Sequence, residues 1–314
     1  MKQRFIFNPH SGHNRRRPGL AGTIRDFIAS RSLDAAISTT EGPGHATVLA
    51  REAALAGCTR VIAVGGDGTM NEVAQALLHT PAALALVPCG SGNGLALHLG
   101  VPTTFSSALR LLTADHARVA AIDTGSANGH PFFNAMGLGL DADVSRRFNT
   151  LTRRGLPAYA RTVVATLREL RTECVTISVG EVRESLEILL LAVANSDQYG
   201  NNARIAPGAR VDDGHLDLIA VLPVGALGFC SLAARLFLGH FDTSRHVRRL
   251  RGRNFSITRD TPGLIHTDGE THATSATVEV RVHPRSLHVL VPAATTAVTA
   301  ADELAPAGFA FLPP

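Results

Sequence analysis

Two patterns of apolar positions divide the chain into parts. In the first part, short strand-like runs alternate with segments of helical spacing, such as 46–56 and 70–78. This alternation predicts a parallel sheet with helices packed on its faces. The predicted strands are Arg4–Phe7, Ala35–Thr39, Arg60–Val64 and Ala83–Val87.

The pattern changes near residue 120. Short β-rich runs then dominate, separated by Asp-Gly, Asn-Gly and Gly-Asn turns, which favours an antiparallel β-sandwich. Helical patches are expected at 157–171 and 225–238. The expected strands are Phe132–Ala135, Cys174–Val179, Ile188–Asn195, Leu216–Val221, Phe255–Thr258, Val278–Val282 and Leu287–Val291. We therefore expect an α/β domain over 1–120, a β-sandwich domain over 121–292, and a tail, 293–314, that packs back on the first domain.

The composition is that of a globular protein, with 45% hydrophobic and 18% charged residues. No apolar run reaches the ~18 residues of a membrane-spanning helix, and the N-terminus lacks the apolar stretch of a signal peptide. We expect a cytoplasmic protein whose contact with a membrane is peripheral. The four cysteines form no Cys-x-x-Cys pair, so neither a zinc site nor a disulfide framework is expected.

The net charge of +4 comes from arginine, because Lys2 is the only lysine. A Walker-type phosphate loop needs a lysine after its glycines, so that class of site is excluded. Arginines cluster at 15–17, 146–154 and 245–253. Each cluster fits either docking on an anionic membrane surface or an ordinary solvated face. Nucleic acid is not an expected partner, because aromatic residues make up only 5% and no recognition motif is present.

The central motif is Gly65-Gly66-Asp67-Gly68-Thr69, which follows a buried strand and leads into a helix carrying Asn71 and Glu72. Adjacent glycines let the backbone approach a phosphate, and the helix N-terminus favours an anion. Asp67 is compatible with phosphate if a cation such as Mg²⁺ bridges the two. The alternative is a tight Asp-Gly turn with Thr69 as helix cap.

Two more turns end predicted strands in the same half. One is Asn8-Pro9-His10-Ser11-Gly12, and the other is Gly90-Ser91-Gly92-Asn93. Ligands bind at the carboxyl ends of strands in open α/β sheets, so a cleft shared by these turns is expected. Taken singly, each also fits an ordinary strand-ending turn.

In this order the three motifs resemble the diacylglycerol kinase catalytic family, which includes bacterial lipid kinases and the sphingosine and ceramide kinases. The segments 132–142 and 195–218 are similar to further family motifs, so the likeness covers nearly the whole chain. It implies a Rossmann-like α/β domain of the NAD kinase and diacylglycerol kinase type with a C-terminal β-sandwich. It also implies an ATP-dependent lipid kinase that uses Mg²⁺ and meets a lipid substrate at the membrane surface.

The resemblance assigns roles to individual residues. Asp67, Asp268 and Glu270 are the predicted catalytic residues, and whether Asp268 or Glu270 is the base is left open. The Asp213 side chain and the carbonyls of Arg210 and His215 are expected to hold a structural magnesium, the alternative being a hairpin turn without metal. ATP is expected to contact Asn8, Ser11, Thr40, Gly65, Gly66, Asp67, Gly68, Thr69, Asn71, Glu72, Gly90, Ser91 and Asn93.

Some residues depart from the family pattern. Leu95-Ala96 follows the second glycine loop, Asn201-Asn202 replaces a glycine-rich run, and His215 stands at a position that is usually apolar or small. The acceptor therefore stays open among diacylglycerol, monoacylglycerol, ceramide, sphingosine and phosphatidylglycerol, and so does a homodimer. The competing interpretations are an NAD kinase and a catalytically silent nucleotide-binding protein. The kinase hypothesis requires Glu270 to share a crevice with the turn at 65–69.

Overall fold

The computed structural model describes every residue except 13, 18, 140–171 and 299–314. Its first half is a parallel sheet in the order β2-β1-β3-β4, with β3 and β4 buried along their whole length. The strands are β1 (Gln3–Phe7), β2 (Ala35–Thr39), β3 (Arg60–Gly65) and β4 (Ala83–Pro88). The helices are α1 (Leu20–Ser30), α2 (His45–Leu55), α3 (Asp67–Leu77), α4 (Gly94–His98) and α5 (Phe105–Leu111), with a 3-10 turn, η1, at Asn14–Arg16.

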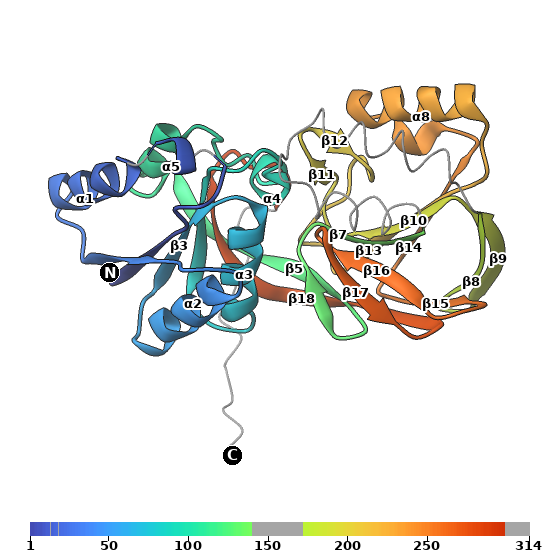
Figure 1. Cartoon of the computed structure of the whole chain (residues 1–314), viewed down its shortest axis with the longest axis horizontal. Helices are drawn as coiled ribbons and strands as arrows, with labels where there is room; N and C mark the ends of the chain where they lie inside the picture. The colour runs from blue at the N-terminus through green and yellow to red at the C-terminus, as the bar shows by residue number, and fades with distance from the viewer. Residues whose placement is uncertain (13, 18, 140–171, 299–314) are drawn as a thin grey trace, which may run out of the picture.

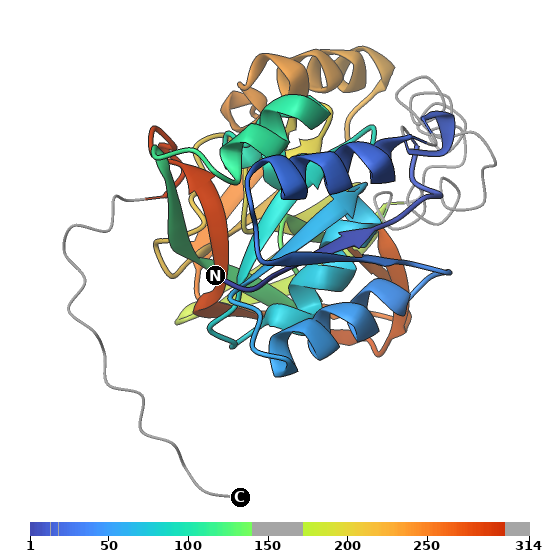
Figure 2. The ribbon, with the colours of Figure 1, turned by 90° about the vertical axis from the view of Figure 1, so that its left-hand side faces the viewer.

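Helices cover both faces of this sheet because its strands alternate buried side chains between the two faces. Phe5 packs with Ile24 of α1 and Ala108 of α5, whereas Ile6 packs with Val73 of α3. Figure 2 shows α1 and α5 above the sheet and α2 and α3 below it. The predicted parallel α/β architecture is confirmed.

The second half is a sandwich of two antiparallel layers. One layer is a six-stranded sheet in the order β14-β13-β10-β7-β16-β17. Its strands are β7 (Ala135–Gly139), β10 (Leu190–Ala194), β13 (Leu216–Val221), β14 (Val247–Gly252), β16 (Gly263–Thr267) and β17 (Glu270–Thr274). The facing layer contains β5 (Ala117–Ala127), β6 (His130–Phe132), β8 (Glu173–Val179), β9 (Val182–Ile188), β15 (Asn254–Arg259) and β18 (Thr277–Pro292).

Apolar side chains from both layers meet in one core that includes Phe132, Leu191, Leu218 and Phe255. This arrangement confirms the predicted sandwich. Over its outer side lie the helix α8 (Ala226–Leu238), the 3-10 turn η2 (Phe241–Thr243) and the short hairpin β11 (Gln198–Gly200) with β12 (Ala203–Arg204).

A long two-stranded ribbon joins the halves (Figure 1). β18 runs through both: it pairs with β15 in the sandwich and in parallel with β4 in the α/β sheet, and β5 accompanies it antiparallel. The sequence predicted two strands, 278–282 and 287–291, where the structure has one strand with a register shift between them. The expected domain boundary after residue 120 lies inside β5. One sheet therefore continues from the α/β half into one layer of the sandwich.

The predicted strand Phe132–Ala135 is interrupted. β6 ends at Phe132 and β7 begins at Ala135, because the backbone N–H groups of residues 133–135 bind a side chain, Asp268, instead of a neighbouring strand. Beyond β18, residues 293–298 lie against the α/β half, where Thr295 donates to the Leu99 carbonyl and Val298 is buried. The expected helix 157–171, the arginines at 146–154 and the end of the tail lie outside the described residues. None of the described helices is long and apolar enough to span a membrane.

The ribbon depends on a close contact between Gly125 of β5 and Phe132 of β6, which are cross-strand partners. A Cβ at Gly125 would overlap the buried Phe132 ring. We expect Gly125→Ala to lower the free energy of unfolding by about 1–3 kcal/mol through overpacking, measured by urea denaturation. Gly19→Ala is the control, because a Cβ there has open space. Equal stability of the two variants would contradict this packing.

Candidate active site

The two glycine turns of the α/β half lie against each other. β3 ends at Gly65 and β4 at Pro88, and these residues are partners in the sheet. A Cβ built on Gly90 would lie only 2.7 Å from the Gly66 Cα, so neither turn tolerates a side chain at this contact. Because the first N–H groups of a helix have no partner within it, the start of α3 next to these turns offers donors to an anion.

Asp67 ties the first turn to the second. Its carboxylate accepts hydrogen bonds from the Asn93 and Gly94 N–H groups, both at 2.9 Å. Asn93 has a positive φ of 52°, and its side chain also bonds to both backbone groups of Gly90. Asp67 therefore fixes the shape of the loop at 90–94, a contact that the sequence motifs alone did not indicate.

The Asn8 turn joins the same edge of the sheet. The Asn8 Nδ2 donates to Thr69 Oγ1 at 2.8 Å, and Ser11 bonds back to the Asn8 carbonyl. Thr40 is buried and its N–H bonds to the Phe7 carbonyl at the end of β1. Glu72 accepts a hydrogen bond from the Ala46 N–H at the start of α2. These contacts bring all the turns predicted to bind nucleotide to one edge.

Two predicted nucleotide-binding side chains are left unused by the protein. Ser91 is exposed and Asn71 is half-buried, and neither side chain makes a hydrogen bond to another described residue. The side chains of Asn8, Ser11, Asp67 and Asn93 hold the turns in place, whereas these two are available to a ligand.

Asp268 organises the turn between β16 and β17. Its carboxylate accepts hydrogen bonds from the three consecutive N–H groups of Phe133, Asn134 and Ala135, at 2.7, 2.9 and 3.0 Å. Burial raises the pKa of Asp268, and these three donors oppose that shift. Both carboxylate oxygens accept backbone hydrogen bonds, Oδ1 from two N–H groups and Oδ2 from one, so Asp268 holds the segment 133–135 to the turn.

Glu270 differs from Asp268 in its surroundings. It begins β17, is exposed, and its carboxylate has no hydrogen bond to another described residue. The turn that carries it is held by Asp268 and by the His266 Nδ1, which accepts from the Gly269 N–H. Of the two predicted bases, Glu270 is the one whose oxygens accept no hydrogen bond from another described residue.

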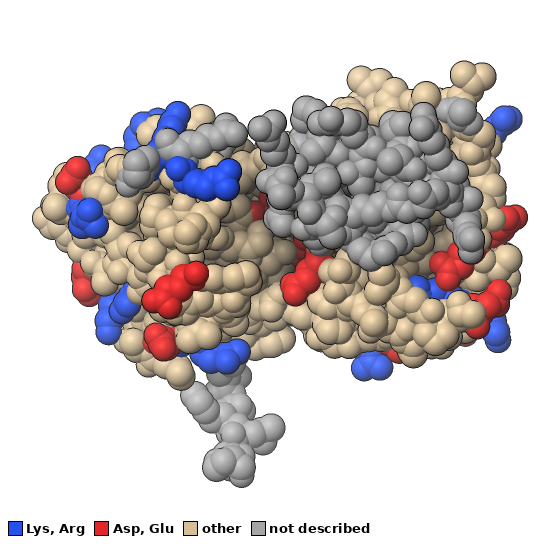
Figure 3. All heavy atoms as spheres, viewed as in Figure 1, with Lys and Arg blue, Asp and Glu red and all other residues tan. Residues whose placement is uncertain are grey.

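A chain of contacts connects the Asp67 loop to this turn. Asp67 holds Gly94, and a Cβ on Gly94 would lie 3.3 Å from the Asn134 Oδ1. Asn134 in turn donates its N–H to Asp268. Ser196 adds a hydrogen bond to the Asn134 side chain. Figure 3 shows the surface hollowed between the two halves, with acidic side chains beside the hollow.

Asn134 and Ser196 lie in the segments similar to family motifs, but the sequence analysis predicts no role for either residue. The sequence carries no signal for these roles, because the burial of both side chains and the position of Asn134 beside Gly94 exist only in the folded chain. His272 was also missed: its Nε2 bonds to Thr267 Oγ1 at 2.8 Å and its ring stacks on His130. Burial lowers the pKa of His272, and the neighbouring His130 ring lowers it further.

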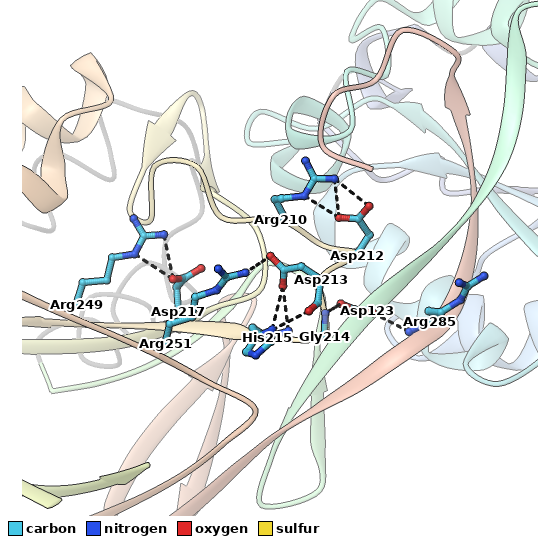
Figure 4. Close-up of polar contacts among 10 residues, drawn as sticks. All are labelled: Asp123, Arg210, Asp212, Asp213, Gly214, His215, Asp217, Arg249, Arg251 and Arg285. Carbon is cyan, nitrogen blue, oxygen red and sulfur yellow. Dashed lines mark hydrogen bonds and ion pairs between the residues drawn. The ribbon is translucent and has the colours of Figure 1, made fainter. Parts of the chain in front are cut away.

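The predicted metal loop is shown in Figure 4. Asp213 accepts a hydrogen bond from the His215 N–H and forms an ion pair with Arg251. Arg210, whose carbonyl was the expected ligand, directs its guanidinium to both oxygens of Asp212. The buried Asp123 on β5 accepts from the Gly214 and Arg285 N–H groups, and thus fastens the loop to the ribbon.

This arrangement is a poor fit to a resident magnesium. The carboxylates of the loop, Asp212 and Asp213, already face the positive charges of Arg210 and Arg251, so a metal at Asp213 would have to displace an arginine. Within the described residues no group of three or more His, Cys, Asp or Glu side chains could hold a metal. The magnesium at Arg210, Asp213 and His215 stays a prediction.

Comparison with known proteins agrees with both halves of this geometry. Residues 2–127 match the model of the diacylglycerol kinase catalytic domain, and residues 134–291 match the YegS C-terminal NAD kinase beta sandwich-like domain. The chain belongs to this lipid kinase family. Membership confirms the predicted enzyme class, an ATP-dependent kinase of the lipid kinase family.

Relatives align over nearly the full length. The diacylglycerol kinase of Bacillus subtilis strain 168 is 28% identical over 93% of this chain and 96% of its own. A Pseudomonas syringae protein named "Probable lipid kinase YegS-like" is 30% identical over 90% of this chain and 92% of its own. A crystal structure of a diacylglycerol kinase from Bacillus anthracis strain Sterne, 22% identical, covers 95% of this chain and 98% of its own with a TM-score of 0.71, which shows the same fold.

The two carboxylates of the catalytic turn should respond differently to substitution. We expect Glu270→Gln to lower turnover by ~10² or more, because proton acceptance is lost, without changing the melting temperature. Asp268→Asn should lower the free energy of unfolding by about 1–3 kcal/mol, because the side-chain NH₂ of asparagine would face a backbone N–H donor and leave it without an acceptor. Steady-state kinetics and thermal melts of both variants measure these effects. Wild-type turnover in Glu270→Gln would remove it from the base role.

The metal loop gives a second prediction. EDTA should leave the melting temperature of the wild type unchanged, because Arg251 supplies the charge at Asp213. Arg251→Ala should melt about 1–2 °C lower than the wild type, because a half-exposed ion pair is weak. Added Mg²⁺ should return the melting temperature of this variant to the wild-type value. Arg248→Ala, which breaks a pair with Glu184 on β9 of the facing sheet, is the matched control. A wild type that EDTA destabilises would show that the loop holds a metal.

Proposed function

We propose that the protein transfers the γ-phosphoryl group of MgATP to the hydroxyl of diacylglycerol or a closely related membrane lipid. One observation carries the proposal. Glu270, whose carboxylate has no hydrogen bond to another described residue, lies on a turn that Asp268 fastens to Asn134. The Asn134 side chain occupies the space beside Gly94, in the loop that Asp67 holds next to the glycine turns. A proton acceptor and an anion-binding edge therefore belong to one connected structure.

The proposed nucleotide site is the edge formed by the turns at Asn8, Gly65–Thr69 and Gly90–Asn93. Backbone N–H groups at the start of α3 bind phosphate oxygens, as they do in other sites without a phosphate-loop lysine. Ser91 and Asn71 supply side-chain donors. The turns are rigid before ATP arrives, because Gly66 and Gly90 are in contact and Asp67 caps the second loop. The entropic cost of ordering these turns is therefore incurred when the protein folds and not when ATP binds.

The magnesium of the proposal arrives with ATP and neutralises the charge of its phosphates. Asp67 is the carboxylate of the glycine turns, and each of its oxygens accepts one N–H, which leaves further lone pairs for a cation or its water ligands. The donor set at this edge is therefore compatible with magnesium, in contrast to the Asp213 loop.

In the chemical step, Glu270 accepts the proton of the lipid hydroxyl as its oxygen bonds to the γ-phosphorus. The bond from that phosphorus to the β–γ bridging oxygen breaks, and ADP leaves with the electron pair. The products are ADP, the lipid phosphate and protonated Glu270, which returns its proton to solvent because the side chain is exposed.

The acceptor class rests on the relatives, one of which is named a diacylglycerol kinase. We expect radiolabelled ATP to transfer phosphate to diacylglycerol in mixed micelles, with thin-layer chromatography of a lipid panel as the measurement. NAD in the same assay is the competing acceptor, and Glu270→Gln is the background control. Phosphorylation of NAD in preference to every lipid would favour the NAD kinase alternative. Tight ATP binding with no transfer to any acceptor would favour a silent nucleotide-binding protein.

A further inference from the structure

The helix α8 exposes an apolar face that the sandwich does not use. Its inner side chains, among them Phe229, Leu232 and Leu236, pack against the six-stranded sheet. The residues facing solvent recur at the spacing of one helical face, and they are Leu227, Cys230, Ser231, Ala234, Phe237 and Leu238. A helix that is apolar on both sides is unusual at a protein surface, because one side then lacks a favourable environment.

The exposure of the large side chains is extensive. Leu227 is 90% exposed, Leu238 is 71% exposed and Phe237 is 44% exposed. The face extends for ~16 Å along the helix, given 1.5 Å per residue. Figure 1 places α8 along the outer edge of the sandwich, on the same side as β11 and β12.

Basic side chains surround this face. Arg235 is the one charged residue of α8, Arg204 packs against Gly239 at its end, and the exposed Arg245 follows in the next loop. Acidic side chains nearby are paired with arginines: Asp242 with Arg249, Glu184 with Arg248, and Asp197 with Arg204, which leaves Arg235 and Arg245 as the basic side chains without an acidic partner among these pairs. The helix α8 itself contains no Asp or Glu. Charge complementarity therefore favours an anionic occupant.

We propose that α8 is a docking helix that inserts its outer face into an anionic lipid bilayer. An apolar stripe bordered by arginines is the arrangement by which interfacial helices bind membranes. A second copy of the chain fits less well, because a symmetric contact would bring the arginines of the two copies together. The inference rests on the proposed function, since it says how the enzyme meets a lipid substrate.

The position of α8 links docking to the candidate active site. The helix packs on β12, and β12 pairs with β11. At the other end of this hairpin the Asn201 N–H bonds to the Gly92 carbonyl at 3.0 Å, and Gly200 lies against Gly92. The hairpin of β11 and β12 therefore connects α8, where the bilayer would lie, to the loop Gly90–Asn93 of the proposed nucleotide site.

Vesicle sedimentation without ATP tests the proposal independently of catalysis. The full chain is mixed with vesicles of phosphatidylcholine and phosphatidylglycerol, and with vesicles of phosphatidylcholine alone. We expect binding to the anionic vesicles, and about tenfold or more weaker binding for the triple variant Leu227→Ser, Phe237→Ser, Leu238→Ser. The matched control is Val48→Ser with Leu55→Ser on α2, where the side chains are 48% and 83% exposed but lie in the other half.

Cys230 provides a second measurement on an otherwise native face. Cys174 and Cys230 are exposed, whereas Cys58 and Cys89 are buried. A polarity-sensitive fluorophore on Cys230 in a Cys174→Ser background should shift to the blue when anionic vesicles are added. The same label on Cys174 in a Cys230→Ser background should not shift, because β8 lies away from the proposed membrane contact.

The outcomes separate the two proposals. Equal vesicle binding by the wild type and the triple variant, or no shift of the Cys230 label, would overturn docking by α8. A wild-type dimer that the triple variant converts to monomer, without vesicle binding, would also overturn it. If the label shifts while no lipid is phosphorylated, docking stands and the proposed function fails. With a water-soluble short-chain diacylglycerol, the triple variant should keep the wild-type rate.

Discussion

The binding of three consecutive backbone N–H groups by the Asp268 carboxylate is the interaction on which the candidate site depends. It interrupts the strand that would otherwise run through 132–135 and leaves Asn134 turned toward Gly94. A buried carboxylate is costly unless it is fully hydrogen-bonded, so the segment and the turn stabilise each other. The adjacent Glu270 is thereby positioned without using its own side chain.

The continuous ribbon of β5 and β18 gives this contact a rigid frame. Because these strands belong to both halves, the α/β sheet and one layer of the sandwich form a single hydrogen-bonded sheet. Asp123 on the ribbon binds the loop at 213–215 and the bulge at Arg285, which adds a third connection near the joint. A site assembled from both halves therefore needs no separate docking step between them. The hairpin of β11 and β12 extends the same frame to α8.

The sequence predicted the architecture because its local signals agree with the tertiary structure. The strands at 35–39 and 216–221 have the predicted bounds, and the helix predicted at 225–238 begins one residue later. The pattern did not reveal β5 or the unity of β18, because strand pairing between residues far apart leaves no local signal. It also could not separate Asp268 from Glu270, since a motif gives residue types but not which oxygens are already bonded. The same limit applies to Asp213, whose partner Arg251 is 38 residues away in the chain.

A crystal structure with magnesium and a non-hydrolysable ATP analogue tests the central claim most directly. The account predicts that the terminal phosphate lies on the N–H groups of residues 66–69 and within reach of the Glu270 carboxylate, directly or through one water. A nucleotide bound at another edge of the sheet, or a Glu270 turned away from the phosphate across the molecule, would contradict it.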